Sequence, residues 1–232
     1  MTDVGLKRKQ NEDEMLIDPN GAYCLVADGM GGAAAGKLAS KIFSEHAKGI
    51  LSNDRFSKIK KKIIRKIYTG ANDKILNHIK EFPQHEGMGC TADLLCFNNN
   101  NYLIGHVGDS RTYLFRNNTL QLLTKDHSYV QDQVDSGKIT SEEARIHPNR
   151  NVINKAVGIE MKLVPDIING KCLKGDIFIV CSDGLTDMID DFQLYNILSL
   201  EDSCVLKLNK LIQSAKYAGG KDNITVIIAH IS

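Results

Sequence analysis

The chain of 232 residues carries 29 basic and 28 acidic side chains, so its net charge of +1 gives no field to attract nucleic acid or an anionic membrane. Hydrophobic residues make up 42% of the chain, enough for the core of one domain of ordinary size. The longest apolar runs are strand-sized, no apolar leader follows the first methionine, and the six cysteines form no C-x-x-C pair. We therefore expect a single cytoplasmic domain over residues 1–232, with no membrane and no nucleic acid as partner.

Seven apolar runs bounded by Gly, Asn or Asp have the composition of β-strands. They cover residues 22–27, 91–97, 101–107, 111–115, 119–123, 176–181 and 223–231. Three longer segments, 34–51, 55–80 and 201–217, repeat apolar residues at the spacing of a helix face. Asparagine-rich connections at 97–102 and 116–119 predict hairpin loops. This combination predicts an α+β fold in which antiparallel sheets are covered by helices.

The segment 124–165 differs from the rest of the chain. It is polar, contains Pro148, and has short helical patterns only at 130–136 and 140–145. A long irregular segment inside a compact domain is often functional. We expect it to be a mobile excursion from the core that serves the functional site.

Carboxylates stand beside four of the predicted strands. Asp28, Asp109 and Asp183 follow the runs at 22–27, 101–107 and 176–181, and Asp222 precedes the run at 223–231. Asp-Gly after a strand is a common turn, and for any one aspartate this alternative stays open. Several strands ending in carboxylates would nevertheless gather negative charge at one edge of the sheets, where like charges repel unless they are protonated or bridged by cations. The hard cations Mg²⁺ and Mn²⁺, which prefer oxygen ligands, would resolve that repulsion.

A metal pair of this kind has a characteristic chemistry. Two such ions side by side can hold a shared water, lower its pKa and neutralise a phosphoryl group under attack. Arg8 lies close to a further acidic pair, Glu12 and Asp13, and its guanidinium is suited to grip phosphate oxygens in a fork. The pattern therefore predicts a metal site that, with Arg8, would suit a phosphoryl group.

Seven short motifs follow one another along almost the whole chain. They are Asp3-Val4-Gly5 with Arg8 and Asn11-Glu12-Asp13, Val26-Ala27-Asp28-Gly29-Met30-Gly31-Gly32, Met88-Gly89-Cys90-Thr91-Ala92, His106-Val107-Gly108-Asp109-Ser110-Arg111, Thr124-Lys125-Asp126-His127-Ser128, Cys181-Ser182-Asp183-Gly184-Leu185 and Gly220-Lys221-Asp222-Asn223-Ile224-Thr225. Each motif alone is weak, but together and in this order they are specific. In them the chain resembles the PPM family, the metal-dependent serine/threonine protein phosphatases of type 2C, in their compact bacterial form.

The resemblance implies a four-layer α-β-β-α sandwich of two antiparallel sheets flanked by helices, with a binuclear Mn²⁺ or Mg²⁺ centre. The implied reaction is direct hydrolysis of phosphoserine and phosphothreonine in proteins by a metal-bridging hydroxide, without a phosphoenzyme. The implied substrates are phosphoproteins, including targets of a serine/threonine kinase. We expect the chain to act as a monomer.

The resemblance also assigns the core ligands. Asp28 would bridge the two metal ions, and the carbonyl of Gly29 would ligate one of them. Asp183 and Asp222 would complete this set.

Further residues would support the centre. Asp13 would hold a metal or its water, with Glu12 behind it. Asp109 would share a third, weaker ion with Asp183. Arg8 would bind the substrate phosphate.

The segment 124–165 corresponds to the family's variable flap, which is linked with substrate choice. His127 and His147 lie in or beside it and are candidates to approach the substrate. His106, inside a predicted strand, is expected to be a packed histidine.

Three positions depart from the family's usual pattern. Bacterial members commonly have His where this chain has Ala33, Glu where it has Lys37, and Thr where it has Cys90. Ala33 removes an imidazole near the phosphate, so a general acid is not expected there. A metal-bound water could still protonate the leaving alkoxide, so activity is expected to survive.

Two other readings remain open at this point. The run from Gly31 to Lys37 has the G-x-x-x-x-G-K spacing of a nucleotide-binding P-loop, but Leu38 stands where a Ser or Thr should hold Mg²⁺, and Asp28 would repel phosphates. A non-catalytic pseudophosphatase that binds phosphoproteins is the second alternative. The full set of expected carboxylates argues against it.

Overall fold

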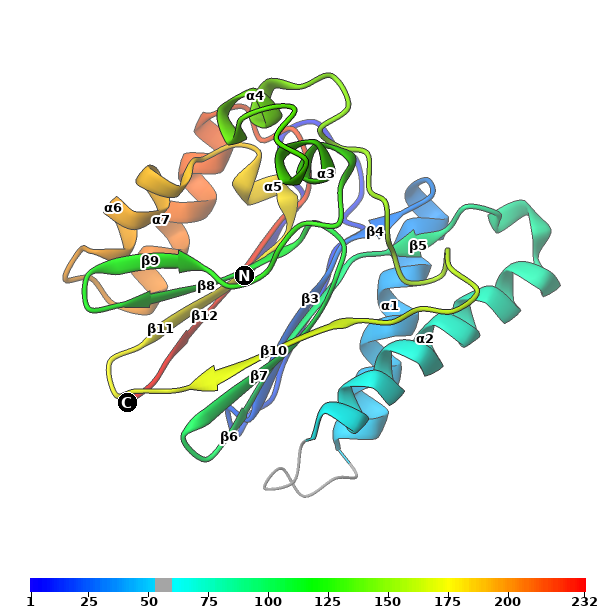
Figure 1. Ribbon diagram of the computed structural model, residues 1–232, viewed down its shortest axis with the longest axis horizontal. Coiled ribbons are helices and arrows are strands. Elements are labelled where there is room, and N and C mark those ends of the chain that lie inside the picture. The colour runs from blue at the N-terminus through cyan, green and yellow to red at the C-terminus, as the bar shows by residue number, and fades with distance from the viewer. Residues whose placement is uncertain (53–59) are drawn as a thin grey trace.

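The computed structural model describes residues 1–52 and 60–232, whose strands form two five-stranded antiparallel sheets packed face to face (Figure 1). The first sheet has the order β1 (Thr2–Asp3), β12 (Ile224–His230), β11 (Ile177–Cys181), β8 (Arg111–Arg116) and β9 (Thr119–Leu122). The second has the order β10 (Asp166–Lys171), β7 (Asn101–Val107), β6 (Ala92–Asn98), β3 (Tyr23–Ala27) and β2 (Glu14–Ile17). A short ladder joins β4 (Gly29–Met30) to β5 (Gly89–Cys90).

Helices cover the outer face of each sheet, which completes four layers (Figure 1). The helices α1 (Ala33–Leu51) and α2 (Lys61–Glu81) lie on the second sheet, and α5 (Asp183–Thr186), α6 (Asp191–Leu198) and α7 (Cys204–Tyr217) lie on the first. The helices α3 (Tyr129–Asp135) and α4 (Ser141–Ile146) belong to the segment 124–165, and a 3₁₀ turn at Pro83–His85 follows α2. The predicted α+β sandwich of two antiparallel sheets flanked by helices is confirmed.

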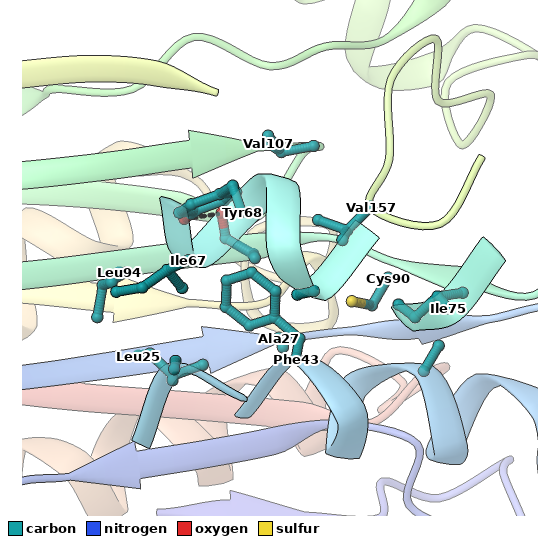
Figure 2. Close-up of a cluster of buried hydrophobic side chains, with 14 of the residues drawn as sticks. Leu25, Ala27, Phe43, Ile67, Tyr68, Ile75, Cys90, Leu94, Val107 and Val157 are labelled. Carbon is teal, nitrogen blue, oxygen red and sulfur yellow. Dashed lines mark hydrogen bonds between the residues drawn. The ribbon is translucent and has the colours of Figure 1, made fainter. Parts of the chain in front are cut away.

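Three apolar layers hold the sandwich together. Under α1 and α2, the rings of Phe43 and Tyr68 meet edge to face with their centroids 4.9 Å apart (Figure 2). Between the two sheets lies Phe178, and under α7 lies Leu211, both fully buried. Each such side chain contributes about 1.5–3 kcal/mol relative to an exposed one. The apolar layers therefore supply the free energy that keeps the polar end of the sandwich in place.

The strongest sequence signals are reproduced closely. Both asparagine-rich connections are tight hairpins, in which Asn117 and Asn118 have φ of 49° and 57° and Asn99 has φ of 52°. Positive φ at a two-residue loop matches the right-handed twist of the flanking strands, and asparagine tolerates it better than most residues. The local chemistry of these turns sets the register of β6 with β7 and of β8 with β9.

Other elements were not predicted. The strands β2 and β10 are partly exposed edge strands with one neighbour each, so neither shows a full apolar run. The helix α6 is short and begins with a capping box between Asp190 and Gln193. The helix expected at 55–80 begins at Lys61, and its stretch 55–59 lies outside the described residues. Within the described ranges, no helix is both long and apolar enough to cross a bilayer.

The Tyr68 hydroxyl gives a test of how α2 is fastened to the second sheet. It donates to the carbonyl oxygens of Ala92, at 2.9 Å, and Gly105, at 2.6 Å, inside the core. Tyr68→Phe keeps the ring but leaves buried carbonyls without this donor, so the free energy of unfolding should fall by about 1–3 kcal/mol in urea denaturation. Tyr217→Phe, on a side chain that is 97% exposed, should leave it unchanged. Equal stability of the two variants would contradict the assignment.

Candidate metal centre

Four aspartates meet at one end of the sandwich. The strands β3 and β7 are both antiparallel to β6 and so run in the same direction, which brings Asp28 and Asp109 to one edge of the second sheet. In the first sheet β11 ends where antiparallel β12 begins, which brings Asp183 and Asp222 together. Because β3 packs against β11 and β12, the two edges adjoin. The four aspartates and Glu12 line one cleft of about 540 Å³.

A close backbone contact fixes two of these aspartates. A Cβ at Gly184 would lie 1.9 Å from the carbonyl oxygen of Asn223, so only glycine lets α5 begin this near to β12. The Ser182 amide also donates to the carbonyl of Thr225 at 3.0 Å. Asp183, the first residue of α5, is thereby held beside Asp222, the residue before Asn223.

A second close contact packs α1 against β4. A Cβ at Gly29 would lie 2.1 Å from the carbonyl oxygen of Gly36, and a Cβ at Gly36 would lie 2.2 Å from Oε2 of Glu12. Gly36 therefore serves helix packing, which explains the spacing from Gly31 to Lys37 without a phosphate-binding loop. Lys37 itself is exposed.

The other two positions that depart from the family pattern are Ala33 and Cys90. The backbone of Ala33 begins α1, but its side chain lies outside what the structure describes. Cys90 is fully buried and pairs with Val157 through backbone bonds of 3.0 and 2.9 Å. This bridge ties the segment 124–165 to β5.

Asp13 is held from one side only. Its Oδ2 accepts hydrogen bonds from the hydroxyls of Ser182, at 2.8 Å, and Thr225, at 2.6 Å. Its Oδ1 is buried and has no hydrogen-bond partner among the described residues. Burial raises the pKa of the Asp13 carboxyl to about 6, although the two hydroxyls oppose the shift.

The carboxyls of Asp28 and Asp183 titrate abnormally because they are crowded. Burial, followed by the charges of Asp13, Asp183 and Asp109, raises the pKa of Asp28 well above its usual range. Burial and the charges of Asp109, Asp187 and Asp222 do the same to the pKa of Asp183. Asp28 is thus the carboxyl that the others surround.

Asp109 completes the crowded group. Burial and the neighbouring charge of Asp126 raise its pKa to about 7, while Arg111 opposes the shift. A carboxyl with this pKa is partly protonated near neutral pH, which is the state expected where no counter-charge neutralises it.

The donor set fits hard divalent cations. The Oδ1 atoms of Asp13, Asp109 and Asp183 are all buried without a hydrogen-bond partner among the described residues. Unsatisfied buried oxygens are costly, and carboxylate oxygens are the ligands that Mg²⁺ and Mn²⁺ prefer. Among the described residues, no three acidic, histidine or cysteine side chains are arranged to hold an ion directly. Mg²⁺ in proteins usually keeps several waters.

Arg8 lies in the same cleft but contacts a carboxylate. Its Nη2 is 2.7 Å from Oδ2 of Asp222, and Arg8 remains half exposed. Lys7 and Lys9 line the cleft on either side of it. Burial raises the pKa of Glu12 above its usual range, and the charge of Arg8 opposes that rise. Three basic side chains, those of Lys7, Arg8 and Lys9, therefore line the same cleft as the acidic residues.

Several residues near the site were not singled out from the sequence. Arg111 donates to both oxygens of Asp126, at 2.9 and 2.7 Å. Asn151 from the segment 124–165 lines the cleft. Arg111 and Asp126 both lie in the sequence motifs described above, so their importance could have been inferred. Asn151 lies in no motif, and nothing in its neighbouring sequence indicates a functional role.

The histidines take other places. His106 is fully buried between the carboxylate of Asp93, at 2.5 Å, and the carbonyl of Lys125, at 2.8 Å, as expected of a packed residue. Burial lowers the pKa of His106, but Asp93 outweighs it and the net shift is upward. His127 stacks on His106 and accepts from the Gly108 amide at 3.0 Å. Neither His127 nor His147 lines the cleft, so their approach to a substrate stays a prediction.

Comparison with known proteins identifies the family. The family model for protein phosphatase 2C matches residues 1–155. The chain is 36% identical to the serine/threonine protein phosphatase PstP of Mycobacterium tuberculosis over 99% of its own length and 44% of that protein's. It is 34% identical to the serine/threonine phosphatase stp of Listeria welshimeri, over 98% of its own length and 92% of that protein's.

Solved structures agree with this assignment. The crystal structure of the Mycobacterium tuberculosis phosphatase PstP/Ppp matches with a TM-score of 0.93 and 34% identity, covering 100% of this chain and 97% of that one. The catalytic domain of PstP in complex with two manganese ions matches with a TM-score of 0.91 and 31% identity, covering 100% and 96% of the two chains. The fold of this chain is the fold of these solved serine/threonine phosphatases. The chain belongs to the protein phosphatase 2C family, and the resemblance found in the motifs is confirmed.

Metal binding should release protons. Carboxyls with pKa values of about 6 and 7, those of Asp13 and Asp109, are partly protonated near pH 6.5 and must ionise to ligate a cation. Calorimetric titration of the metal-free protein with Mn²⁺, in buffers of different ionisation enthalpy, should show more protons released near pH 6.5 than near pH 8. Asp109→Asn should release fewer.

The same shifts set the sign of the stability change. A carboxyl whose pKa is raised by folding stabilises the protein below its unfolded pKa, and this contribution is lost as the pH rises through the folded value. The Tm of the chelated protein should therefore fall between about pH 5 and pH 7.5, and Mn²⁺ should raise it more at the higher pH. A pH-independent effect of Mn²⁺ would contradict the assignment of these carboxyls.

Proposed function

We propose that this chain hydrolyses phosphoserine and phosphothreonine in proteins at a centre that holds Mn²⁺ or Mg²⁺. The observation that carries the proposal is the set of buried carboxylate oxygens without partners at one acid-lined cleft. The names of the phosphatase relatives and the neighbour in complex with two manganese ions support it. When bound, such cations lower the pKa of water and neutralise charge on the phosphoryl oxygens.

The residues divide into distinct roles. Asp28 would bridge two core ions, because it is the carboxyl that the other carboxyls surround. Asp183, Asp222 and the Gly29 carbonyl would complete their ligands. Asp13 would present its free Oδ1 to an ion or its water while its Oδ2 stays bound to hydroxyls.

The outer residues would support this core. Glu12 would stand behind Asp13, and its backbone amide is fixed by the Asn223 side chain at 2.9 Å. Asp109 would share a third, weaker ion with Asp183, because after burial the charge of Asp109 is what most raises the pKa of Asp183. That assignment fits its free Oδ1.

Arg8 would bind the phosphate of the substrate. To do so its guanidinium would leave the Oδ2 of Asp222, and its exposure gives it room to turn. A planar guanidinium can grip two phosphoryl oxygens at once. Lys7 and Lys9 would add positive charge at the mouth of the cleft.

We propose that water, rather than a side chain, attacks phosphorus. Burial raises the pKa of the Cys90 and Cys181 thiols, which keeps them protonated and poorly nucleophilic. The buried hydroxyl of Ser182 is committed to Asp13, and that of Ser110 to Thr91 at 2.7 Å. Direct hydrolysis without a phosphoenzyme is the reaction that this environment favours.

We also propose that residues 1–232 act as one phosphatase unit in the cytoplasm, with the segment 124–165 as its flap. All six cysteines are free, which suits a reducing compartment. Because helices cover the outer face of each sheet, we propose a monomer. Its substrates would be phosphoproteins, among them targets of a serine/threonine kinase. A pseudophosphatase would not need the four aspartates that line the cleft.

Removing the bridging carboxylate tests the reaction. The purified protein should release phosphate from p-nitrophenyl phosphate and from phosphothreonine peptides with Mn²⁺ or Mg²⁺, and excess EDTA should abolish this. Asp28→Ala should lower kcat at least about a hundredfold, whereas Asp109→Ala should lower it less. Asp73→Ala, at an exposed position of α2, is the matched control. Turnover that persists in EDTA, or an Asp28→Ala variant within about tenfold of the parent, would rule out the bridging role.

Arg8 can be tested separately from the metals. Arg8→Ala should raise KM for a phosphothreonine peptide at least about tenfold, because a charge-assisted fork to phosphate is lost. Arg8→Lys should recover only part of this, since a lysine cannot form the fork. Lys80→Ala, exposed at the end of α2, should match the parent. An unchanged KM in Arg8→Ala would remove Arg8 from the phosphate site.

A further inference from the structure

A second cavity, of about 450 Å³, opens beside the cleft. Its lining comes from α3 and α4 of the segment 124–165 on one side and from β8, α5 and the start of α6 on the other. We call it the flap-side pocket. Asp109, Asn151 and Asp183 line both cavities, so the two are neighbours. A peptide whose phosphate lies in the cleft would therefore pass the entrance of the pocket.

Part of the charge in the flap-side pocket is neutralised within the protein. Arg111 is paired with Asp126, and Nη2 of Arg150 lies 3.2 Å from Oδ2 of Asp187. These two pairs leave no net charge. They join the segment 124–165 and β8 to one another and to the end of α5, and so hold the pocket's shape.

The remaining charge is negative. Glu142, at the exposed first turn of α4, has no ion-pair partner among the described residues. Asp191, which also lines the pocket, accepts the Tyr113 hydroxyl at 3.0 Å through Oδ1 and has no ion-pair partner among the described residues. Asp109 lies at the inner end of the pocket, where we assign its Oδ1, which has no partner in the described chain, to an ion rather than to a substrate side chain. One guanidinium, that of Arg145, offsets them.

Arg145 is bound by backbone carbonyls rather than by a carboxylate. Its Nη2 donates to the carbonyl oxygens of Thr186, at 3.2 Å, and Ile189, at 3.4 Å, and so fastens α4 to the end of α5. The pocket keeps a surplus of carboxylates that an incoming cation can meet.

Apolar surface accompanies the carboxylates. Phe192, which is 70% exposed, lines the pocket together with Leu122 and Val134. A long side chain with an aliphatic stem and a cationic end matches such a lining. A guanidinium suits it better than an ammonium, because it stacks on an aromatic face and pairs with carboxylates in a fork.

We propose that the flap-side pocket takes an arginine side chain of the phosphoprotein substrate. The arginine would lie within three positions of the phosphorylated residue, a reach of about 10 Å of extended chain. This inference rests on the proposed function, and it names the substrate class: phosphoserine or phosphothreonine with an arginine nearby. Glu142 and Asp191 are the specificity-determining residues.

Matched peptides test the proposal. In a set of phosphothreonine peptides of otherwise neutral residues, each peptide carries a single arginine at one of the three positions on either side of the phosphothreonine. Each has a partner peptide with the uncharged isostere citrulline at the same position. At the favoured position arginine should lower KM about tenfold relative to citrulline, the effect of one charged hydrogen-bonded pair, with kcat unchanged. Hydrolysis of p-nitrophenyl phosphate, which has no such residue, provides the baseline.

Variants then locate the effect. Glu142→Lys should abolish the arginine preference and favour a peptide with glutamate at that position, a reversal that simple disruption of the flap would not give. Glu201→Lys introduces the same charge at an exposed site outside both cavities and should keep the preference. Phe192→Ala should weaken it. All three should retain the parent kcat on p-nitrophenyl phosphate.

A binding measurement separates this inference from the proposed function. Non-hydrolysable phosphonate versions of the peptides are titrated into the Mn²⁺-loaded protein by fluorescence anisotropy. Equal KM and equal affinity for arginine and citrulline peptides at every position would overturn the inference while leaving the phosphatase intact. If no peptide were hydrolysed, the proposed function would fall. A binding preference for arginine that is lost in Glu142→Lys would still support the pocket, and its absence would overturn it.

Discussion

Repulsion between carboxylates gathered at one end of the sandwich is the constraint on which the rest of this structure depends. Burial raises the pKa of Asp28, and the charges of three neighbouring carboxylates raise it further. Such a group forms only because the apolar layers on both sides of each sheet contribute enough free energy to hold it. Cations that neutralise the group would be part of the folded state as well as of the reaction.

The surroundings of the centre divide its oxygens into two kinds. Asp13 has one oxygen bound by two hydroxyls and one oxygen bound by nothing in the described chain, so its orientation is fixed before any ligand arrives. The backbone contact at Gly184 does the same for α5. Preorganised ligands of this kind lose little entropy when an ion binds, because their geometry has already been set by folding.

Strand-end aspartates could be predicted from the sequence because strand direction alone decides where they meet. The tight hairpins could also be predicted, since the asparagines at 117 and 118 tolerate the positive φ that the turn requires. Long-range pairings could not be predicted: nothing near Arg8 indicates that it contacts Asp222, which is 214 residues away. Edge strands such as β10 were not predicted from the sequence, because a strand that is partly exposed to solvent lacks a continuous apolar run. His127 stacks on His106 at the start of the segment 124–165, a long-range contact that no local pattern indicates, and its approach to a substrate stays a prediction.

The position of the segment 124–165 has a consequence for how such a protein can diverge. It connects β9, at the edge of the first sheet, with β10, at the edge of the second, and the strands that carry the acidic residues lie elsewhere in the chain. Insertions or exchanges within this segment would reshape the wall of the flap-side pocket without disturbing the register of those strands. Substrate specificity could therefore change through the segment 124–165 while the catalytic residues, which lie on other parts of the chain, stay the same.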